Sequence, residues 1–303
     1  VGQAATARAT PAAMSVIGIV GGSGLYDLEG LTERAWVTVT SPFGAPSDQL
    51  LTGWLGDQRV AFLPRHGRGH RIPPGEINYR ANVDALKRVG CTALVSVSAV
   101  GSLREELAPG TFVLVDQFID RTLRGPKSFF GTGLVAHVSM GRPTCGRLID
   151  KLEAAARDVA VPVVRGGTYV VMEGPQFSTM AESAWHRSLG ADVIDMTNMP
   201  EAKLAREAEL CYATVAMVTD FDCWHPGHDH VEVSSVIAVL HANGAAVRTL
   251  LSRALPTLGD ATPCPHRCDR ALDHALITAP DARDPAVCAQ LDAVAGRVLG
   301  RAS

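Results

Sequence analysis

The chain has 303 residues, of which 47% are hydrophobic and 19% are charged, a balance typical of a globular protein with a sizeable core. A formal net charge of -3 argues against a nucleic-acid binder that relies on a broad basic surface, and no apolar run reaches the roughly 18 residues of a membrane helix. Seven scattered cysteines, an odd number, do not make a disulfide framework. They suit a reducing compartment, so we expect a cytoplasmic protein.

The N-terminal segment before Met14 lacks the apolar centre of a secretory signal. It carries one arginine and no acidic residue, which leaves a transit peptide open. We expect residues 1–13 to be a disordered leader or a tag. Residues 14–303 then form a single domain that ends in a helical segment.

Short apolar runs rich in β-branched residues predict strands at Val16–Val20, Val60–Leu63, Ala93–Val97, Phe112–Val115, Tyr169–Met172 and Thr214–Val218. Helical patterns alternate with them at Tyr79–Val89, Cys145–Val159, Ala181–Leu189, Pro200–Glu209, Val233–Leu255 and Pro285–Leu299. This alternation predicts a single-domain α/β fold with a mixed, mostly parallel sheet flanked by helices. Ligands of such sheets bind at the carboxyl ends of the strands.

The first predicted strand ends in Gly21-Gly22-Ser23-Gly24. Glycines that adopt positive φ let backbone N–H groups converge on an anion, and the Ser23 hydroxyl adds a donor. Asp27 stands where a dinucleotide-binding fingerprint needs its third glycine. A simple tight turn uses the same glycines, so both interpretations stay open here.

A basic, glycine-spaced segment, Arg65–Arg71, follows the second of these strands. The planar fork of Arg65 suits phosphate, and His66 beside it offers another hydrogen bond. Charge runs are more often solvated surface loops. Ser98 and Ala99 follow the next strand, and three small, polar strand ends together favour one anion pocket.

Two further strand ends carry candidate substrate contacts. The turn after Met172 holds Phe177, whose ring suits a planar ligand, although a single phenylalanine is usually core. Met196-Thr197 follows Val193–Ile194 and offers an apolar side chain beside a hydroxyl.

Asp220 and Asp222 follow the last predicted strand, separated by one residue, so both carboxyl groups can point the same way. Like charges and burial raise a carboxyl pKa, so one of the pair can stay protonated near neutral pH. A protonated acid can donate to the ring nitrogen of a departing base.

A metal site is the rival interpretation, because His225, His228 and His230 lie just downstream of the two aspartates. Their spacing matches no compact metal motif, so we expect no metal. Cys264 and Cys268 could form a disulfide or half of a metal site, but no second cysteine pair follows them. We expect two unrelated thiols.

Several motifs, in order between about Val16 and Leu255, resemble the S-methyl-5′-thioadenosine phosphorylases, in the trimeric branch of the purine nucleoside phosphorylases. They are GIVGGSGLYDLEG, SPFG, LPRHGRGHRIPPGEINYRAN, SAVGSLREEL, EGPQFST, DMTNMPEAKLARE and TDFDCW.

The resemblance implies roles for individual residues. It implies phosphate contacts by Ser23, Arg65, His66, Ser98, the backbone of Ala99, and Thr197. Met196 would lie against the ribose, and Phe177 against the base. Asp220 and Asp222 would be catalytic and bind the base, with Ser178 and Val233 as specificity positions. Val233 and Val236 would line the pocket of the 5′ substituent, together with His137 of a neighbouring subunit.

The expected reaction is phosphorolysis of S-methyl-5′-thioadenosine to adenine and S-methyl-5-thio-α-D-ribose 1-phosphate, with phosphate as co-substrate and no cofactor. Two aspartates favour a 6-aminopurine, whose amino group donates and whose N7 accepts. The apolar Val233 favours a methylthio group over a hydroxyl. The alternative is a purine nucleoside phosphorylase acting on inosine, guanosine or adenosine. The resemblance also implies a homotrimer, with no nucleic-acid or membrane partner. Asp195 and Asn198 depart from the expected pattern, and their polarity suggests altered ribose recognition.

Overall fold

The computed structural model describes residues 15–22, 25, 28–227, 233–259 and 263–300. The predicted leader, residues 1–13, lies outside the described residues. Within them, no helix combines the length and apolar character needed to cross a membrane.

The long strand β5 (Cys91–Ser102) organises an 11-stranded mixed sheet. It pairs in parallel with β1 (Val16–Gly21), which pairs in parallel with β4 (Gln58–Pro64). The antiparallel strands β3 (Leu50–Leu55) and β2 (Leu31–Val37) extend this side.

On its other side, β5 joins two groups of strands. Most of its length pairs in parallel with β11 (Cys211–Asp220), which continues to β6 (Phe112–Val115) and β8 (Val163–Arg165). Its last residues pair antiparallel with β10 (Val193–Asp195), followed by β9 (Thr168–Val171) and β7 (Gln117–Asp120). The expected mixed, mostly parallel sheet is confirmed.

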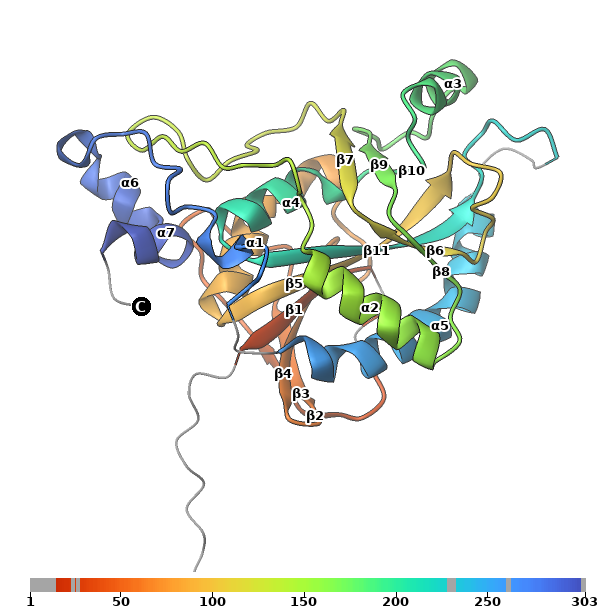
Figure 1. The fold of residues 1–303 in the computed structure, drawn as a ribbon, viewed down its shortest axis with the longest axis horizontal. Coiled ribbons are helices and arrows are strands. Elements are labelled where there is room, and N and C mark those ends of the chain that lie inside the picture. The colour runs from red at the N-terminus through yellow and green to blue at the C-terminus, as the bar shows by residue number, and fades with distance from the viewer. Residues whose placement is uncertain (1–14, 23–24, 26–27, 228–232, 260–262, 301–303) are drawn as a thin grey trace, which may run out of the picture.

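Helices cover both faces of this sheet (Figure 1). On one face α1 (Tyr79–Arg88) contacts α4 (Asn198–Glu207) and α7 (Asp292–Leu299), and on the other α2 (Gly146–Asp158) contacts α5 (Val233–Leu258). The remaining α-helices are α3 (Met180–Ser188) and α6 (Pro285–Gln290). Short 3₁₀ turns lie at Pro74–Glu76, Cys268–Arg270 and Pro280–Ala282.

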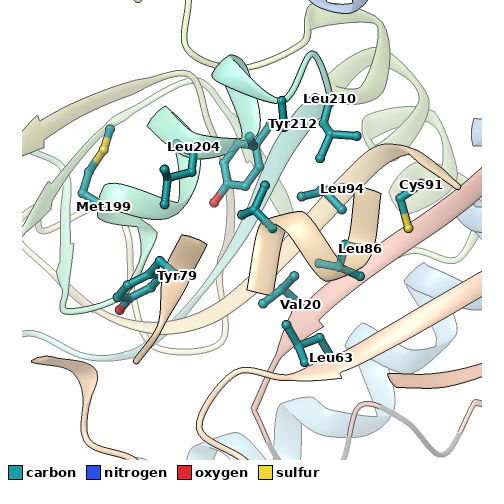
Figure 2. Close-up of a cluster of buried hydrophobic side chains, with 14 of the residues drawn as sticks. Val20, Leu63, Tyr79, Leu86, Cys91, Leu94, Met199, Leu204, Leu210 and Tyr212 are labelled. Atoms are coloured by element: carbon teal, nitrogen blue, oxygen red, sulfur yellow. The ribbon is translucent and has the colours of Figure 1, made fainter. Parts of the chain in front are cut away.

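The alternation of side chains along β1 explains the two cores. Ile17 and Ile19 belong to the cluster packed under α2 and α5, whereas Val16 and Val20 belong to the cluster on the α1 and α4 face. This is the period of two expected for a strand covered on both sides. Figure 2 shows Val20 among the side chains that α1, α4 and β11 contribute to the second cluster.

The structure also departs from the expectations. The sequence patterns did not predict β2, β3, β7 and β8, and β2 exposes most of its residues. The helix expected over Pro285–Leu299 is interrupted at Leu291, whose ψ of 16° departs from helical geometry, and forms α6 and α7.

Candidate active site

The polar strand ends lie at one edge of the sheet, as expected for parallel strands. The N–H of Arg65 donates to the carbonyl of Gly21 at 2.9 Å, which joins the ends of β4 and β1. Ser98 and Ala99 were expected beyond the end of a strand, but β5 continues to Ser102 and holds them within it. They lie beside Ala216 and Met217 of β11. Pairing with β11 thus carries β5 past the point where its apolar run ends.

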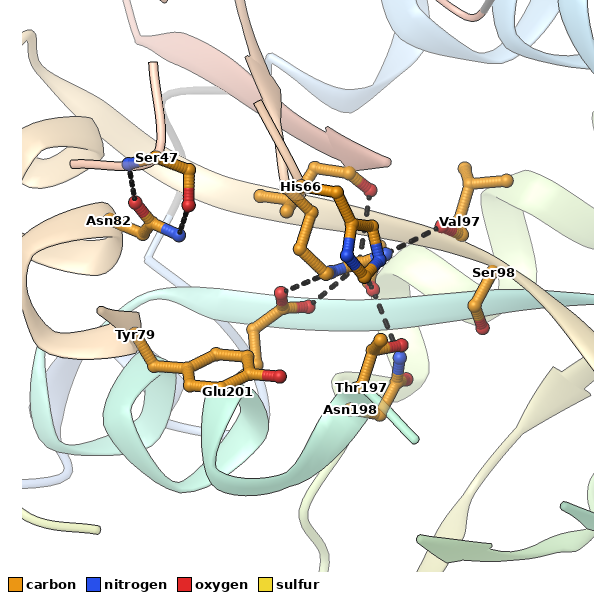
Figure 3. A network of polar contacts seen from close by, with 12 residues as sticks. Ser47, His66, Tyr79, Asn82, Val97, Ser98, Thr197, Asn198 and Glu201 are labelled. Atoms are coloured by element: carbon orange, nitrogen blue, oxygen red, sulfur yellow. Dashed lines mark hydrogen bonds and ion pairs between the residues drawn. The ribbon is translucent and has the colours of Figure 1, made fainter. Parts of the chain in front are cut away.

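Arg65 is 1% exposed, and its guanidinium is turned inward. It forms a two-point ion pair with Glu201, with N···O distances of 2.8 and 3.1 Å, and also donates to Ser96 Oγ and to the carbonyls of Val97 and Val20. Figure 3 shows this network, with its partners Glu201 and Val97 labelled. Although burial disfavours the charge, Glu201 raises the pKa of Arg65 above its usual value. This arrangement makes Arg65 a fixed internal cation.

His66 is neutral and oriented by the main chain. Burial, together with the charge of Arg65, lowers the pKa of His66 to about 4. Its Nδ1 lies 2.9 Å from the carbonyl oxygen of Ile72, and since a carbonyl only accepts, Nδ1 carries the proton. The ring stacks on His70 with centroids 4.2 Å apart. Nε2 is therefore left as an acceptor.

Two predicted phosphate contacts, Ser98 and Thr197, are linked by a chain of hydroxyl groups around Asp195. Ser98 Oγ lies 3.3 Å from the hydroxyl of Tyr169, which donates to Asp195 Oδ2 at 2.7 Å. Thr197 donates to the same oxygen at 2.7 Å. Burial raises the pKa of Asp195 against the effect of these two donors. Asp195 thus orients Thr197 directly and Ser98 through Tyr169.

Asn198, the other departure noted in the sequence, has a structural role. It is fully buried, and its Oδ1 accepts from the hydroxyls of Thr214 at 2.6 Å and Tyr212 at 3.2 Å. Its Nδ2 donates to Ser96 Oγ. These contacts engage the amide inside the core, which argues against the ribose role suggested for it.

Arg124 fixes the substrate loops and was missed by the sequence reasoning. Its buried guanidinium donates to the carbonyl of Met196 at 2.8 Å and to the carbonyls of Met172 and Glu173 at 3.1 and 2.7 Å. It also donates to the hydroxyl of Tyr79 at 3.0 Å. A single arginine in an irregular segment gives no sequence signal for such a role.

The predicted ribose and base contacts lie on these loops. Met196 is 7% exposed and packs against Gly174, where a Cβ would lie 2.4 Å from its sulfur. Gly174 also has a φ of 69°, so this position favours glycine on two grounds. Phe177 is 44% exposed. Its ring is thus accessible to a ligand.

Asp220 ends β11 and is held by two donors. Its Oδ1 accepts from the N–H of Asp222 at 2.8 Å, and its Oδ2 from the hydroxyl of Thr219 at 2.7 Å. A Cβ on Gly101 would lie 2.8 Å from Oδ1, so glycine at this position leaves the space that the carboxyl group of Asp220 occupies. Burial, with repulsion from Asp222 and Asp195, raises the pKa of Asp220.

Asp222 is 6% exposed, and its Oδ2 is buried without a hydrogen-bond partner in the described part of the chain. Burial raises the pKa of Asp222; the hydroxyls of Ser183 and Ser178 lie close enough to oppose the shift, but neither makes a hydrogen bond to Oδ2. A buried polar atom that lacks a partner is costly. This one is therefore a strong candidate to meet a ligand.

The comparisons with known proteins agree with this geometry. A profile described as the phosphorylase superfamily matches residues 16–256. The S-methyl-5′-thioadenosine phosphorylase of Cereibacter sphaeroides is 60% identical over 286 residues, covering 94% of this chain and 99% of the relative. The chain belongs to the S-methyl-5′-thioadenosine phosphorylases of the phosphorylase superfamily.

Solved structures of this family share the fold. A methylthioadenosine phosphorylase from an antarctic soil metagenomic library superposes with a TM-score of 0.87 at 45% identity, covering 93% of this chain and 99% of that one. The methylthioadenosine phosphorylase of Schistosoma mansoni, in complex with adenine, gives a TM-score of 0.81 at 40% identity, covering 86% and 99%.

The described structure does not place every predicted site residue of this phosphorylase beside Asp220 and Asp222. Ser23 and the side chains of Val233 and Val236 lie outside the described residues. His137 is exposed, and its backbone N–H donates to the carbonyl of Ala275 at 2.9 Å. It lines a separate cavity of about 420 Å³.

The rival metal site of the phosphorylase receives no support from the described residues. His225 Nε2 lies 3.0 Å from Glu105, and its ring stacks on Phe221. His228 and His230 lie outside the described residues. In the described part of the chain, a grouping of potential metal ligands occurs only at four cysteines away from the aspartates.

The expectation that Cys264 and Cys268 are unrelated thiols is wrong. Their sulfurs lie with those of Cys145 and Cys211 in one buried cluster. Cys145 and Cys211, which are far apart in the chain, form the second cysteine pair that the local sequence pattern did not reveal.

Proposed function

We propose that this chain catalyses the phosphorolysis of S-methyl-5′-thioadenosine, using Asp220 and Asp222 to bind and protonate the departing adenine. The observation that carries the proposal is the buried Oδ2 of Asp222, without a partner in the described chain, beside a second carboxyl of raised pKa. Adenine supplies complementary groups, because its 6-amino group donates and its N7 accepts. The adenine complex of the Schistosoma mansoni relative is consistent with this assignment.

In the proposed reaction the C1′–N9 bond breaks through an oxocarbenium-like state. A phosphate oxygen forms the new bond to C1′ from the opposite face and inverts that carbon. The bonding electrons leave with N9, and a proton from the aspartate pair reaches N7. This proton transfer stabilises the leaving group, and burial, which raises the pKa of both carboxyl groups, favours their protonated form.

The phosphate would be bound by Ser23, by the backbone of Ala99, and by the hydroxyl groups of Ser98 and Thr197, which would turn from Tyr169 and Asp195 to donate to phosphate oxygens. His66 is neutral with Nε2 as an acceptor, so it fits a protonated phosphate oxygen. The buried guanidinium of Arg65 contributes positive charge to the phosphate site. Its hydrogen bonds to Glu201 and to the carbonyl of Val97 hold α4 and β5 in place. We therefore assign Arg65 to positioning the phosphate loop.

We also propose a cytoplasmic homotrimer without a catalytic cofactor. Leu123 is 90% exposed on the segment whose amides hold Glu173, and the nearby cavity beside His137 is lined by Phe130, Val138 and other residues. The trimer follows from the resemblance to the trimeric branch of the purine nucleoside phosphorylases, and we expect Leu123 and this cavity to lie at the subunit contact. We expect light scattering to give three times the chain mass, and a fully active monomer would contradict the assembly.

The function is tested by measuring nucleoside cleavage in phosphate-containing and phosphate-free buffer. Methylthioadenosine, adenosine and inosine are compared at equal concentration. We expect phosphate-dependent cleavage with a preference for methylthioadenosine. Equal turnover without phosphate would indicate a hydrolase, and a preference for inosine would support the alternative purine nucleoside phosphorylase.

A further inference from the structure

A cluster of four cysteines lies outside the proposed catalytic site. The sulfurs of Cys145, Cys211, Cys264 and Cys268 all lie within 4.8 Å of one another. All four residues are buried, with exposed fractions of 0 to 5%. The Sγ atoms of Cys145 and Cys264 are 3.5 Å apart, and all four thiols are free.

The fold brings these cysteines together from three segments. Cys145 is the N-cap of α2, and its N–H donates to the carbonyl of Tyr212 at 2.7 Å, beside Cys211 at the start of β11. Cys264 and Cys268 come from the segment after α5. Between them, Arg267 adopts a φ of 55° and donates its N–H to the carbonyl of Cys264 at 2.8 Å. This turn lets both sulfurs face the other pair.

We propose that Cys145, Cys211, Cys264 and Cys268 bind one structural zinc ion. Four thiolates are a common ligand set for structural zinc, and the three-residue spacing between Cys264 and Cys268 lies within the usual range. A zinc–sulfur bond of about 2.3 Å in a tetrahedron places the sulfurs about 3.8 Å apart. The cluster, with one sulfur pair at 3.5 Å and no separation above 4.8 Å, therefore needs only a small contraction.

A positively charged side chain lies against the cluster. Arg147 places Nη2 3.6 Å from Cys211 Sγ, and its Nε is buried without a partner among the described residues. Zinc binding by four thiols releases four protons and leaves a net charge of -2 on the site. The guanidinium of Arg147 offsets part of that charge.

The zinc would stabilise the fold and take no part in the chemistry. Cys211 and Asp220 are the first and last residues of β11. Nine steps of about 3.3 Å separate them by about 30 Å. The ion would instead anchor the segment after α5 to the starts of α2 and β11, where regular secondary structure is sparse.

The test begins with metal analysis of the full-length protein, purified under reducing conditions from zinc-supplemented cells. We expect one zinc per chain. The double variant Cys264→Ser/Cys268→Ser should retain less than about one tenth of that amount by loss of two ligands. Cys288→Ser is the matched control, because Cys288 is half-buried and outside the cluster, and it should keep its zinc.

Three measurements on the wild type keep the test decisive if the double variant does not fold. Titration with a mercurial should release zinc as the thiols react, and cobalt reconstitution should give the intense visible bands of tetrahedral thiolate coordination. After denaturation in chelator without reductant, all seven cysteines should be alkylated. Chains that lack zinc and take up neither metal, or chains with cluster disulfides, would overturn the proposal. Metal content and nucleoside cleavage are measured separately, so failure of the zinc proposal would leave the proposed function unaffected.

Discussion

The backbone N–H of Asp222 donates a 2.8 Å hydrogen bond to Oδ1 of Asp220, so the main chain at Asp222 fixes the carboxyl group of Asp220. Asp222 adopts a φ of 51°, a left-handed conformation that Asp and Asn tolerate better than most residues. Substitution of either aspartate by asparagine therefore preserves the backbone and tests the chemistry of the carboxyl groups.

Asp220→Asn should cripple turnover of methylthioadenosine and leave phosphate affinity nearly unchanged. An amide cannot supply an acidic proton to N7, and losing a general acid costs about 10²–10⁴-fold in rate. An amide can both accept and donate at positions 6 and 7, so relative activity should shift toward methylthioinosine. Steady-state kinetics with both nucleosides measure the effect.

Two comparisons make this result specific. Asp57→Asn changes an exposed turn residue and should leave the kinetics unchanged. Unchanged turnover and preference in Asp220→Asn would show that Asp220 is not the acid. Asp222, with its unpartnered Oδ2, would then be the remaining candidate.

Gly101→Ala should lower turnover by displacing Asp220. The new Cβ would lie 2.8 Å from Oδ1 of Asp220 and 3.2 Å from Ile194 Cγ2. A displacement of about 1 Å at a catalytic group can cost about 10²-fold in rate. Gly141→Ala is the matched control, because a Cβ there meets nothing within 4 Å. Equal kinetics for the two variants would contradict the role assigned to Gly101.

Glu201→Gln should reduce the free energy of unfolding by about 3–5 kcal/mol, because it leaves the buried charge of Arg65 without its counter-ion. Both side chains of this pair are at most 3% exposed. The Arg253–Asp158 pair has side chains about half exposed, so Asp158→Asn should cost at most about 1 kcal/mol. Urea unfolding monitored by fluorescence compares the variants. Similar small losses would argue against Arg65 as an internal anchor.

Glu207 should make stability fall as the pH rises toward neutrality. Burial raises the pKa of Glu207 from 4.5 to about 7, although the amide of Phe129 and the hydroxyl of Ser128 oppose the shift. Between these values the folded chain binds more protons than the unfolded chain, so the free energy of unfolding decreases with pH. The loss amounts to at most about 3 kcal/mol and is complete above about pH 7.

Glu207→Gln should remove this dependence, because an amide can accept from Phe129 and donate to the Ser128 oxygen. Its stability advantage over the wild type should be small near about pH 5 and largest above about pH 7. Urea unfolding across this range measures it, with the exposed Glu29→Gln as control. Parallel curves for wild type and Glu207→Gln would disprove the assignment.

Local patterns in the sequence were sufficient for most of the strands that are buried on both faces, although β3, which is also largely buried, was missed. The apolar, β-branched run at Val16–Val20 predicted a strand because burial on both sides requires such a run. Asp220 and Asp222 were predicted as a pair because their spacing at a strand end is itself local. The exposed strand β2 and the short strands β7 and β8 carry a weaker pattern, and pairing with neighbours decides their structure.

Features that depend on contacts between segments distant in the sequence were revealed only by the tertiary structure. Arg65 was expected to bind phosphate from a flexible loop, yet Glu201, 136 positions away, holds it inside the core. Cys145 and Cys211 meet Cys264 and Cys268 because β11, α2 and the segment after α5 converge, which no spacing in the chain reveals. Sequence spacing constrains only neighbours along the chain, whereas a buried charge or thiol is assigned its partner by packing across the sheet.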